Sequence, residues 1–415
     1  MGILAARSSA ERFATYLDGL VGVIGHAARV RPMRDYCTGL LLPCDRKSVE
    51  PIAAATAPAR VGAQHQALLH FVAEGVWSDA AVLAKVREMV LPEIERHGAI
   101  EAWIIDDTSF PKHGAHSVGV THQYCGQLGK QANCQVAVSL SVANRHASLP
   151  VMYRLYLPKS WADDKKRRKK TGVPDGIAFQ TKPKIALDQI AWACAAGLPR
   201  GVVLMDSAYG TDAFLRRGVR DLGLDYAAAV HARTLVEGLE GRAGKMTAEA
   251  LAAGLQKRAW KTIAWREGSA EPLRSRFARV RVHARGEGCT PDEPEQWLLI
   301  EWPKGEKAPT KFWLCTLPHN VAFDRLVDIT MMRWTMMRWR IERDYHDLKQ
   351  EVGLGHFEGR GWRGFHHHAT MCIAAYAFLI SERGAIPPSE ARCEILLPQP
   401  AVPTGYRPRG TAAAA

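Results

Sequence analysis

The stretch Trp103-Ile104-Ile105-Asp106-Asp107-Thr108 decides the fold class, because an apolar run ends there in two carboxylates. A second stretch has the same form, with residues 202–205 leading to Asp206. Both patterns predict a buried strand that is followed by an aspartate. In an α/β sheet, ligands bind beyond the carboxyl ends of the strands. Both strand ends are therefore candidate ligand positions.

The surrounding sequence predicts an α/β fold in which helices flank a mixed sheet. Residues 134–143 alternate apolar and polar side chains, as a strand with one buried face does. The predicted elements, in chain order, are strands over 103–106, 134–143 and 151–157, a helix over 183–196, a strand over 202–205, a helix over 212–222 and a strand over 226–230. This succession of strands and helices predicts one layered α/β core.

A third carboxylate lies in the stretch from Arg338 to Lys349, which reads as a helix. Arg338 precedes Glu342 by four residues and Lys349 follows it by seven, so the three side chains share one helix face. Such a stripe is commonly a solvated ladder of ion pairs. The two upstream aspartates favour another interpretation, because three carboxylates can hold two divalent cations for attack on a phosphodiester.

Three blocks resemble the DDE transposases of bacterial insertion sequences, a family with an RNase H-like catalytic domain. The blocks are Asp106-Asp107-Thr108 with Lys112 and Gly114, Asp206-Ser207-Ala208-Tyr209, and Arg338-x3-Glu342-x6-Lys349. The third block is similar to the Tyr-Arg-Glu-Lys signature of one large branch, although Thr335 stands at the tyrosine position. Further similar stretches extend the resemblance from about residue 35 to residue 380.

The resemblance implies that Asp106, Asp206 and Glu342 are catalytic and hold two Mg²⁺ ions, for which Mn²⁺ substitutes. Such ions activate the attacking water or DNA 3′-OH and stabilise the leaving oxygen. Arg338 and Lys349 would contact phosphates beside the scissile bond. The implied activity is cleavage at the ends of an insertion sequence and their joining to target DNA. The implied partners are double-stranded DNA and, by analogy, a second copy of the chain.

Three alternatives stay open at this point. Asp107 could replace Asp106 as a ligand, although Asp106 is preferred because it shares a strand face with Ile104. A structure-specific DNA nuclease could use the same fold. A catalytically inactive DNA-binding regulator could descend from a transposase, but intact carboxylates argue against it.

The charge of the chain indicates a polyanionic partner. The 415 residues carry a net charge of +13 and the pI is about 9.4, which favours nucleic acid over a membrane surface. Two basic segments are candidate DNA contacts. The first, expected in a loop, consists of Lys165, Lys166, Arg167, Arg168, Lys169 and Lys170. The second is one face of a predicted strand, with Arg279, Arg281, His283 and Arg285. This face could instead be the solvent-exposed side of a packing module, that is, of a sheet that serves only to pack on the rest of the protein.

The predicted domain organisation follows from the changes of period along the chain. The interval from Asp206 to Glu342 is 342 − 206 = 136 residues, which is more than the fold needs and indicates an inserted small β-sheet. The first predicted segment, residues 1–97, is a helical domain that could bind DNA ends. The catalytic core is predicted in two parts, 98–232 and the C-terminal helices over 319–383, with a β-rich insertion over 233–318 between them. A flexible tail is predicted over 384–415.

The remaining features predict a cytoplasmic, nucleoid-associated protein without a small-molecule substrate. Nine cysteines lack any C-x-x-C pair and are typical of buried apolar residues in a reducing compartment. The apolar run from Met371 to Ile380 is too short to cross a bilayer, and the N-terminus has no signal pattern. The three adjacent histidines at 366–368 would point about 100° apart on a helix, which argues against one metal site.

Overall fold

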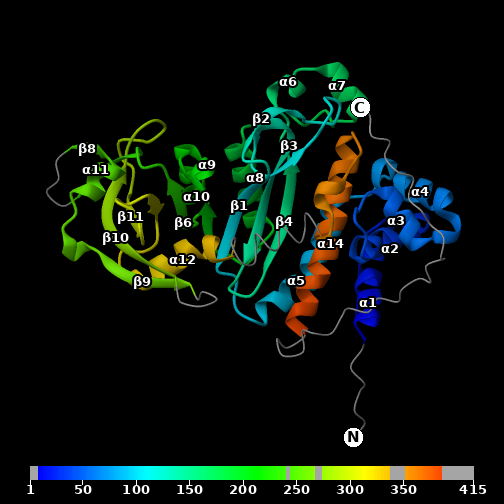
Figure 1. Cartoon of the computed structure of the whole chain (residues 1–415), viewed down its shortest axis with the longest axis horizontal. Coiled ribbons are helices and arrows are strands. Elements are labelled where there is room, and N and C mark those ends of the chain that lie inside the picture. Colours follow the sequence, from blue (N-terminus) through cyan, green and yellow to red (C-terminus); the bar gives the residue numbers. More distant parts are fainter. Residues whose placement is uncertain (1–7, 240–243, 267–272, 337–350, 386–415) are drawn as a thin grey trace, which may run out of the picture.

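A computed structural model describes residues 8–239, 244–266, 273–336 and 351–385, and Figure 1 shows how they are arranged. One large mixed sheet runs through the molecule and helices pack on it. The sequence-based prediction of a mixed α/β sheet flanked by helices is confirmed, and the arrangement is consistent with an RNase H-like fold.

The sheet has twelve strands in the order β2-β3-β1-β5-β6-β12-β11-β10-β7-β8, with β4 paired to β3 and β9 paired to β10. Strands β1, β5 and β6 are parallel neighbours, and the other pairs are antiparallel. The strands are β1 (Ala102–Pro111), β2 (Thr121–Cys125), β3 (Lys130–Ala143), β4 (Ser148–Leu155), β5 (Val202–Met205), β6 (Tyr226–Val230), β7 (Leu235–Gly238), β8 (Lys245–Thr247), β9 (Lys261–Arg266), β10 (Leu273–Ala284), β11 (Glu295–Pro303) and β12 (Lys311–Cys315).

The β2–β3 hairpin is an addition to the predicted elements. Strand β2 is short and mostly polar and pairs only with β3, so it lacks the apolar alternation that predicts a strand. The turn before β3 contains Gly129 with φ of +63°, a conformation that glycine adopts without strain. Gly129 and Lys130 therefore belong to a hairpin and not to a phosphate-binding loop.

The inserted strands do not form the separate small sheet that the sequence predicts. Strand β12 pairs with β6 in antiparallel register, and β11 and β10 continue outward from β12. This pairing covers the edge that β6 would otherwise expose. The insertion is therefore an extension of the central sheet, with the short helix α11 (Ala248–Ala253) beside β7 and β8.

The N-terminal region is helical, as predicted. Ser78 caps α5 by accepting a hydrogen bond from the amide of Ala81. The helices of this region are α1 (Ser9–Val21), α2 (Ala27–Leu41), α3 (Val49–Thr56), α4 (Val61–Leu69) and α5 (Asp79–Glu95). The helices that follow are α6 (Lys159–Ala162), α7 (Lys165–Thr171), α8 (Lys182–Ala195), α9 (Ser207–Gly210), α10 (Ala213–Asp221), α12 (Phe323–Met336) and α14 (Trp362–Ala385).

Helix α14 joins the N-terminal helices to the sheet. It packs against α2, α5 and β4, and it contains the apolar run from Met371 to Ile380. The hydroxyl of Tyr16 donates to the carbonyl of Ala374 at 2.8 Å, so α1 is bound to the same helix. One apolar core therefore runs from the N-terminal helices through α14 to the sheet (Figure 1).

The three histidines of α14 are structural residues with separate partners. His367 lies between the carbonyls of Val72 and Trp77 and stacks on the Trp77 ring at 3.6 Å. His368 contacts the hydroxyl of Tyr36 at 2.8 Å. Burial lowers the pKa of each imidazole, His366 included, to about 4. Each therefore stays neutral in the core.

The cysteines and the helices give two further findings. All eight described cysteines are free thiols and five of them are buried, whereas Cys393 lies outside the described residues. Within the described ranges, no lone helix combines the length and apolarity of a membrane span, and only residues 58–74 with 79–95 do so together, across a 97° bend. Met331 and Met332 are buried core residues, as predicted.

Candidate catalytic site

Asp106 and Asp206 lie at the same level of two neighbouring parallel strands. In the register of β1 and β5, Ala102 pairs with Val202 and Ile104 with Leu204, an offset of 100 residues. Two residues further along, the same offset places Asp106 beside Asp206. Adjacent strands are about 4.8 Å apart. The structure thus brings two of the three predicted catalytic carboxylates to one edge of the sheet.

Both aspartates belong to the face of the sheet that α12 covers. Ile104 and Leu204 pack in one apolar cluster with residues of α12, among them Leu326 and Met331. Side chains alternate between the faces of a strand, so Asp106 and Asp206 follow Ile104 and Leu204 on this side. Further along the same face, Phe110 contacts Phe365 of α14 at a ring distance of 5.7 Å. Figure 1 shows β1 between α12 and α14.

Asp107 lies on the opposite face and has a different partner. Its Oδ2 is 2.8 Å from Nζ of Lys182 on α8, and both side chains are 30% exposed. Asp106, in contrast, accepts a hydrogen bond at Oδ1 from the amide of Asp107 at 2.8 Å. The adjacent carboxylates therefore face different helices. Sequence reasoning missed Lys182, because 75 residues separate it from Asp107 and only the fold brings the two together.

The orientation of Asp206 is fixed by the start of α9. Its Oδ1 accepts hydrogen bonds from the amides of Ala208 at 2.9 Å and Tyr209 at 3.2 Å. Tyr209 is buried, so its ring packs in the core. A Cβ on Gly210 would lie 2.1 Å from the carbonyl oxygen of Ala229, so only glycine allows α9 to approach β6 this closely.

The third predicted carboxylate, Glu342, lies outside the described residues, as do Arg338 and Lys349. Helix α12 leads directly into this segment and packs on the face that carries Asp106. Within the described part of the chain, no cluster of three or more His, Cys, Asp or Glu side chains is placed to hold a metal. Two aspartates on neighbouring strands nevertheless supply the hard oxygen ligands that Mg²⁺ prefers.

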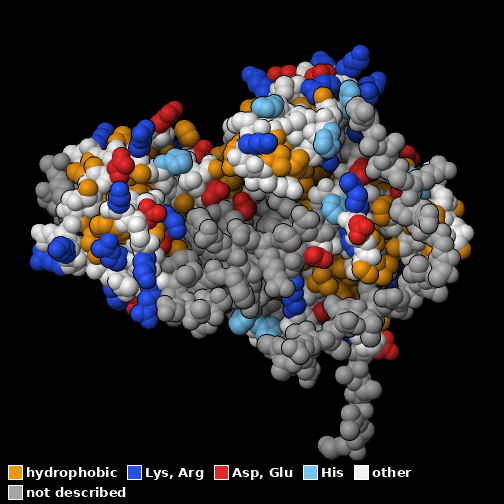
Figure 2. All heavy atoms as spheres, in the orientation of Figure 1, with side chains coloured by type: hydrophobic (Ala, Val, Ile, Leu, Met, Phe, Trp, Pro, Cys, Tyr) orange, Lys and Arg blue, Asp and Glu red, His pale blue; other side chains and the backbone are white. Residues whose placement is uncertain are grey.

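The basic run at residues 165–170 forms the helix α7, and the prediction of a loop is wrong. Asp164 caps the helix by accepting from the amide of Arg167, and Gly172 ends it in the left-handed conformation. Lysine and arginine are good helix formers, so the caps suffice to define a short helix. Figure 2 shows the Lys and Arg side chains gathered over α6 and α7.

The six bases of α7 fall into two groups. The guanidinium of Arg167 lies 3.7 Å from the centre of the Trp161 ring, and Arg168 donates to the carbonyl of Ile177 at 2.6 Å. These two arginines hold the helix on the fold. The other group is exposed to solvent and forms no ion pair with any described residue; it consists of Lys165, Lys166, Lys169 and Lys170.

The predicted basic face of β10 is largely neutralised. Arg279 donates to the carbonyl of Val321 at 2.7 Å, and burial lowers its pKa. Arg281 pairs with Glu295, and Arg285 pairs with Glu237 at 2.8 Å. The apolar side of the strand, from Ala278 to Ala284, packs in the core as predicted. The described contacts thus match the packing module that the sequence left open, rather than a bare basic platform.

The site combines a mixed α/β sheet with two aspartates on neighbouring parallel strands, Asp106 within β1 and Asp206 just after β5, an arrangement consistent with the RNase H-like class of nucleases. A family profile described as "DDE superfamily endonuclease" matches residues 19–272, and one described as "Transposase DDE domain" matches residues 177–378. The first match covers more than half of the chain, so the chain belongs to the DDE endonuclease superfamily.

The chain is also similar to a curated protein from Microchaete diplosiphon, named "Probable transposase for insertion sequence element IS701". The two sequences are 29% identical over 173 residues. The matched region spans 41% of this chain and 42% of that relative, so less than half of either protein is compared.

Proposed function

We propose that this protein is a transposase that cuts DNA at the ends of an insertion sequence and joins those ends to target DNA. The observation that supports the proposal most is the register of β1 and β5: Ile104 pairs with Leu204, and Asp106 and Asp206 each follow these paired residues by two positions. Family membership supports DNA as the substrate. Glu342 is proposed as the third catalytic carboxylate because it follows α12.

The carboxylates would hold two Mg²⁺ ions, or Mn²⁺ in their place. Bound there, the ions would supply activation of the attacking hydroxyl and stabilisation of the leaving oxygen. Asp206 is oriented for this role by the amides of α9, and Asp106 by the β1 strand. The protein would then contribute by positioning the scissile phosphate of the DNA and by excluding its unproductive orientations.

Basic side chains would bind the DNA on either side of the cut. Arg338 and Lys349 are proposed as clamps on flanking phosphates, and the exposed lysines of α7 as contacts to the backbone further away. Two ends must be cut together, so we propose that a homodimer forms on the DNA, which would place the protein at the bacterial nucleoid. The arginines of β10 are not included, since Arg281 and Arg285 already pair with carboxylates.

Cleavage of a DNA fragment that carries the gene with its flanking sequence tests the proposal. With Mg²⁺, the wild-type protein should cut at two sites that bracket the gene, and Asp206→Ala should abolish cleavage while binding in EDTA persists. Cutting at wild-type rate by Asp206→Ala would contradict the assigned site. Cutting at branched structures without any joining to a second DNA would identify a structure-specific nuclease instead.

A further inference from the structure

A basic cavity of about 570 Å³ lies beyond the end of β1, past the aspartates. Four chain segments line it: the end of β1 with the loop that follows, the turn at Gln127, the segment 355–360 and the N-terminal loop at Arg46. Six of its lining residues are basic or can become so, namely Arg46, Lys112, His113, His116, His356 and Arg360. Glu358 is the one carboxylate among the described residues that line it.

The walls of this basic cavity are held by hydrogen bonds between the segments. Lys112 donates from Nζ to the carbonyl of Phe357 at 2.6 Å, and the amide of Val118 donates to the carbonyl of Arg360 at 3.0 Å. The amide of Lys47 donates to Nδ1 of His356 at 2.9 Å, which leaves Nε2 of that imidazole to carry the proton. The cavity is therefore a built feature of the fold.

Its charge is only partly balanced within the protein: Arg46 pairs with Glu358 at 2.7 Å, whereas Lys112 and Arg360 form no ion pair with a described residue. Burial lowers the pKa of Lys112, and the neighbouring Arg46 lowers it further while Glu358 raises it. Burial lowers the pKa of His356 too, and Arg46 and Lys47 add to this effect. Cations that disfavour one another's charge are stabilised when an anion enters. The cavity thus has the electrostatics of an anion site.

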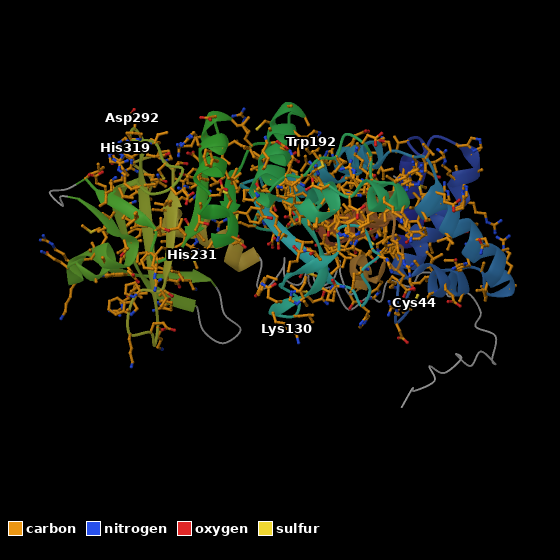
Figure 3. All side chains as sticks on the ribbon, turned by 90° about the horizontal axis from the view of Figure 1, so that it is seen from above. Cys44, Lys130, Trp192, His231, Asp292 and His319 are labelled. Carbon is orange, nitrogen blue, oxygen red and sulfur yellow. The ribbon has the colours of Figure 1, made fainter. Side chains whose placement is uncertain are left out.

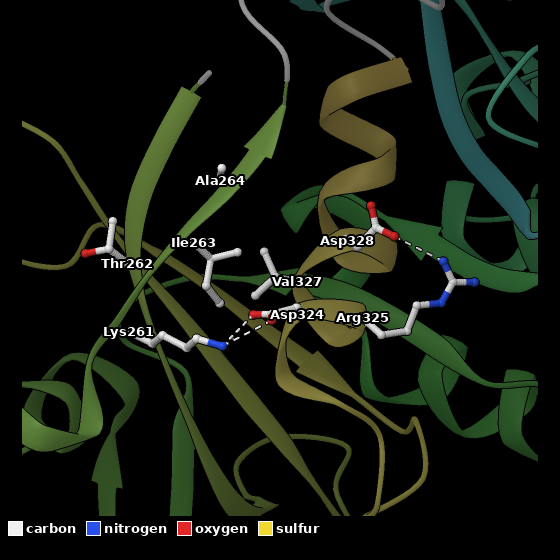
Figure 4. A pocket seen from close by; sticks show the side chains of 8 residues that line it. All are labelled: Lys261, Thr262, Ile263, Ala264, Asp324, Arg325, Val327 and Asp328. Atoms are coloured by element: carbon white, nitrogen blue, oxygen red, sulfur yellow. Dashed lines mark hydrogen bonds and ion pairs between the residues drawn. The ribbon is translucent and has the colours of Figure 1, made fainter. Parts of the chain in front are cut away.

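A second cavity, of about 540 Å³, shows the contrast (Figure 4). There Lys261 binds Asp324 with Nζ 2.9 Å from Oδ1, and Arg325 lies 3.1 Å from Asp328. Each cation that lines it already has a carboxylate, so this cavity gives no reason to expect an anion. The two cavities are similar in size, but only the basic cavity has more cationic than anionic side chains in its lining.

The position of the basic cavity fits DNA. Phe110 is four residues beyond Asp106 on an extended strand, a distance of roughly 13 Å. Phosphates on one DNA strand rise by about 3.4 Å each, so the cavity lies about four nucleotides from the aspartates. In Figure 3, Lys130 at the hairpin turn and Cys44, two residues before Arg46, lie along one edge of the molecule.

We propose that the basic cavity binds backbone phosphates of the DNA strand that runs past Asp106 and Asp206. This inference rests on the proposed function, since it takes DNA as the substrate. It assigns Arg46, Lys112 and Arg360 to DNA binding and makes Glu358 a group that weakens binding. The assignment predicts opposite effects from neutralising the cations and from neutralising the carboxylate.

Binding to a fluorescein-labelled duplex in EDTA tests the cavity without any cleavage. The exposed residues Arg46 and Arg360 should tolerate replacement, so Arg46→Gln/Arg360→Gln should fold and bind roughly 10- to 30-fold more weakly at physiological salt. Its log–log salt slope should be flatter by about 0.9 for each phosphate that the variant no longer neutralises. Glu358→Gln should bind more tightly than wild type. The matched control Lys304→Gln/Lys307→Gln, which removes the same charge from an exposed turn after β11, should bind as wild type.

The possible results separate this proposal from the transposase proposal. If the double arginine variant binds like the control, or if Glu358→Gln does not tighten binding, the cavity is not a DNA site, while cleavage by the wild type can still support transposition. If the wild type cuts no DNA but the cavity variants alter binding as described, the cavity assignment stands and the catalytic proposal falls. If the wild type binds no duplex at all, both proposals fall.

Discussion

Two regions of the central sheet use charge in different ways. Around β1 and β5, Asp106 and Asp206 lie on neighbouring strands, the nearby cavity has one acid among its cations, and four lysines of α7 are exposed. Around β10–β12, charges are paired: Arg281 with Glu295, Arg285 with Glu237, and the buried Glu293 with Arg220 at 2.9 Å. Paired charges support a fold, whereas unbalanced charges can bind a ligand.

The largest expected effect concerns the carboxylate that follows α12. Glu342→Gln should lower DNA cleavage by roughly 10²–10³-fold or more even at saturating Mg²⁺, because it removes a proposed metal ligand. Lys349→Ala should instead weaken DNA binding more than it raises the Mg²⁺ requirement. Titration of Mg²⁺ against the cleavage rate distinguishes the two roles. Equal shifts of the Mg²⁺ requirement at constant DNA affinity would remove the clamp role of Lys349.

Acid should destabilise the catalytic end through the buried histidines of α14. Unfolded imidazoles take up a proton near pH 6.5, whereas His366, His367 and His368 stay neutral in the fold down to about pH 4. The unfolded state therefore binds protons first as the pH falls, and the free energy of unfolding should drop between about pH 6.5 and pH 4. Burial raises the pKa of Asp79 to about 6, which opposes part of this loss because the folded state then binds that proton first.

Urea unfolding measured across this pH range tests the histidine prediction. The total loss should be on the order of a few kcal/mol, since one pKa unit corresponds to about 1.4 kcal/mol. His366→Gln should flatten the pH dependence, and His319→Gln, at an exposed position near β12 (Figure 3), should leave it unchanged. A free energy of unfolding that is constant from pH 6.5 to pH 4 would contradict the neutral state of these residues.

The exposed lysines of α7 should matter for DNA binding. Replacing Lys165, Lys166, Lys169 and Lys170 by Ser should weaken duplex binding about 10- to 100-fold and flatten the salt slope by roughly 0.9 for each phosphate left without a lysine. The variant keeps Arg167 and Arg168, which hold the helix on the fold. An unchanged salt slope would remove α7 from the DNA interface.

The smallest effect is expected from the paired arginines of β10. Arg281→Gln breaks the pair with Glu295 and the contact with the Trp297 ring, so it should cost about 1 kcal/mol of stability. Duplex affinity should stay that of wild type. Weaker DNA binding at wild-type stability would show that this face binds DNA. The contrast between the β10–β12 region and the region around β1 and β5 would then be wrong.

Sequence patterns predicted the elements that bury an apolar face. Strands β1, β3, β5 and β6 were predicted from apolar runs and alternation, which are local properties. The polar edge strand β2 was missed, because its sequence lacks apolar alternation and the strand is defined only by its pairing with β3. The run at 165–170 was assigned to a loop because its composition hid the two caps at Asp164 and Gly172.

Site residues were predictable only where the chemistry is local. The apolar runs before Asp106 and Asp206 pointed to these residues, although β1 continues to Pro111 and only β5 ends next to its aspartate. The partners of charged groups could not be read in this way: Lys182 reaches Asp107, and Glu237 reaches Arg285, only through the tertiary fold. The pairing of the β10 arginines, and with it the absence of a basic platform among the described residues, was therefore hidden from sequence reasoning.

The α12 side of β1 carries the proposed catalytic carboxylate, and substitutions at two adjacent residues of this strand test the assignment most directly. Asp106→Asn and Asp107→Asn remove the same charge from neighbouring residues on opposite faces, and the cleavage rate of flanked DNA with Mg²⁺ is compared at equal DNA binding. Asp106→Asn should lower the rate roughly 10²–10³-fold or more, while Asp107→Asn should retain most activity and give up only the ion pair with Lys182. Full activity of Asp106→Asn together with loss of cleavage in Asp107→Asn would contradict the account.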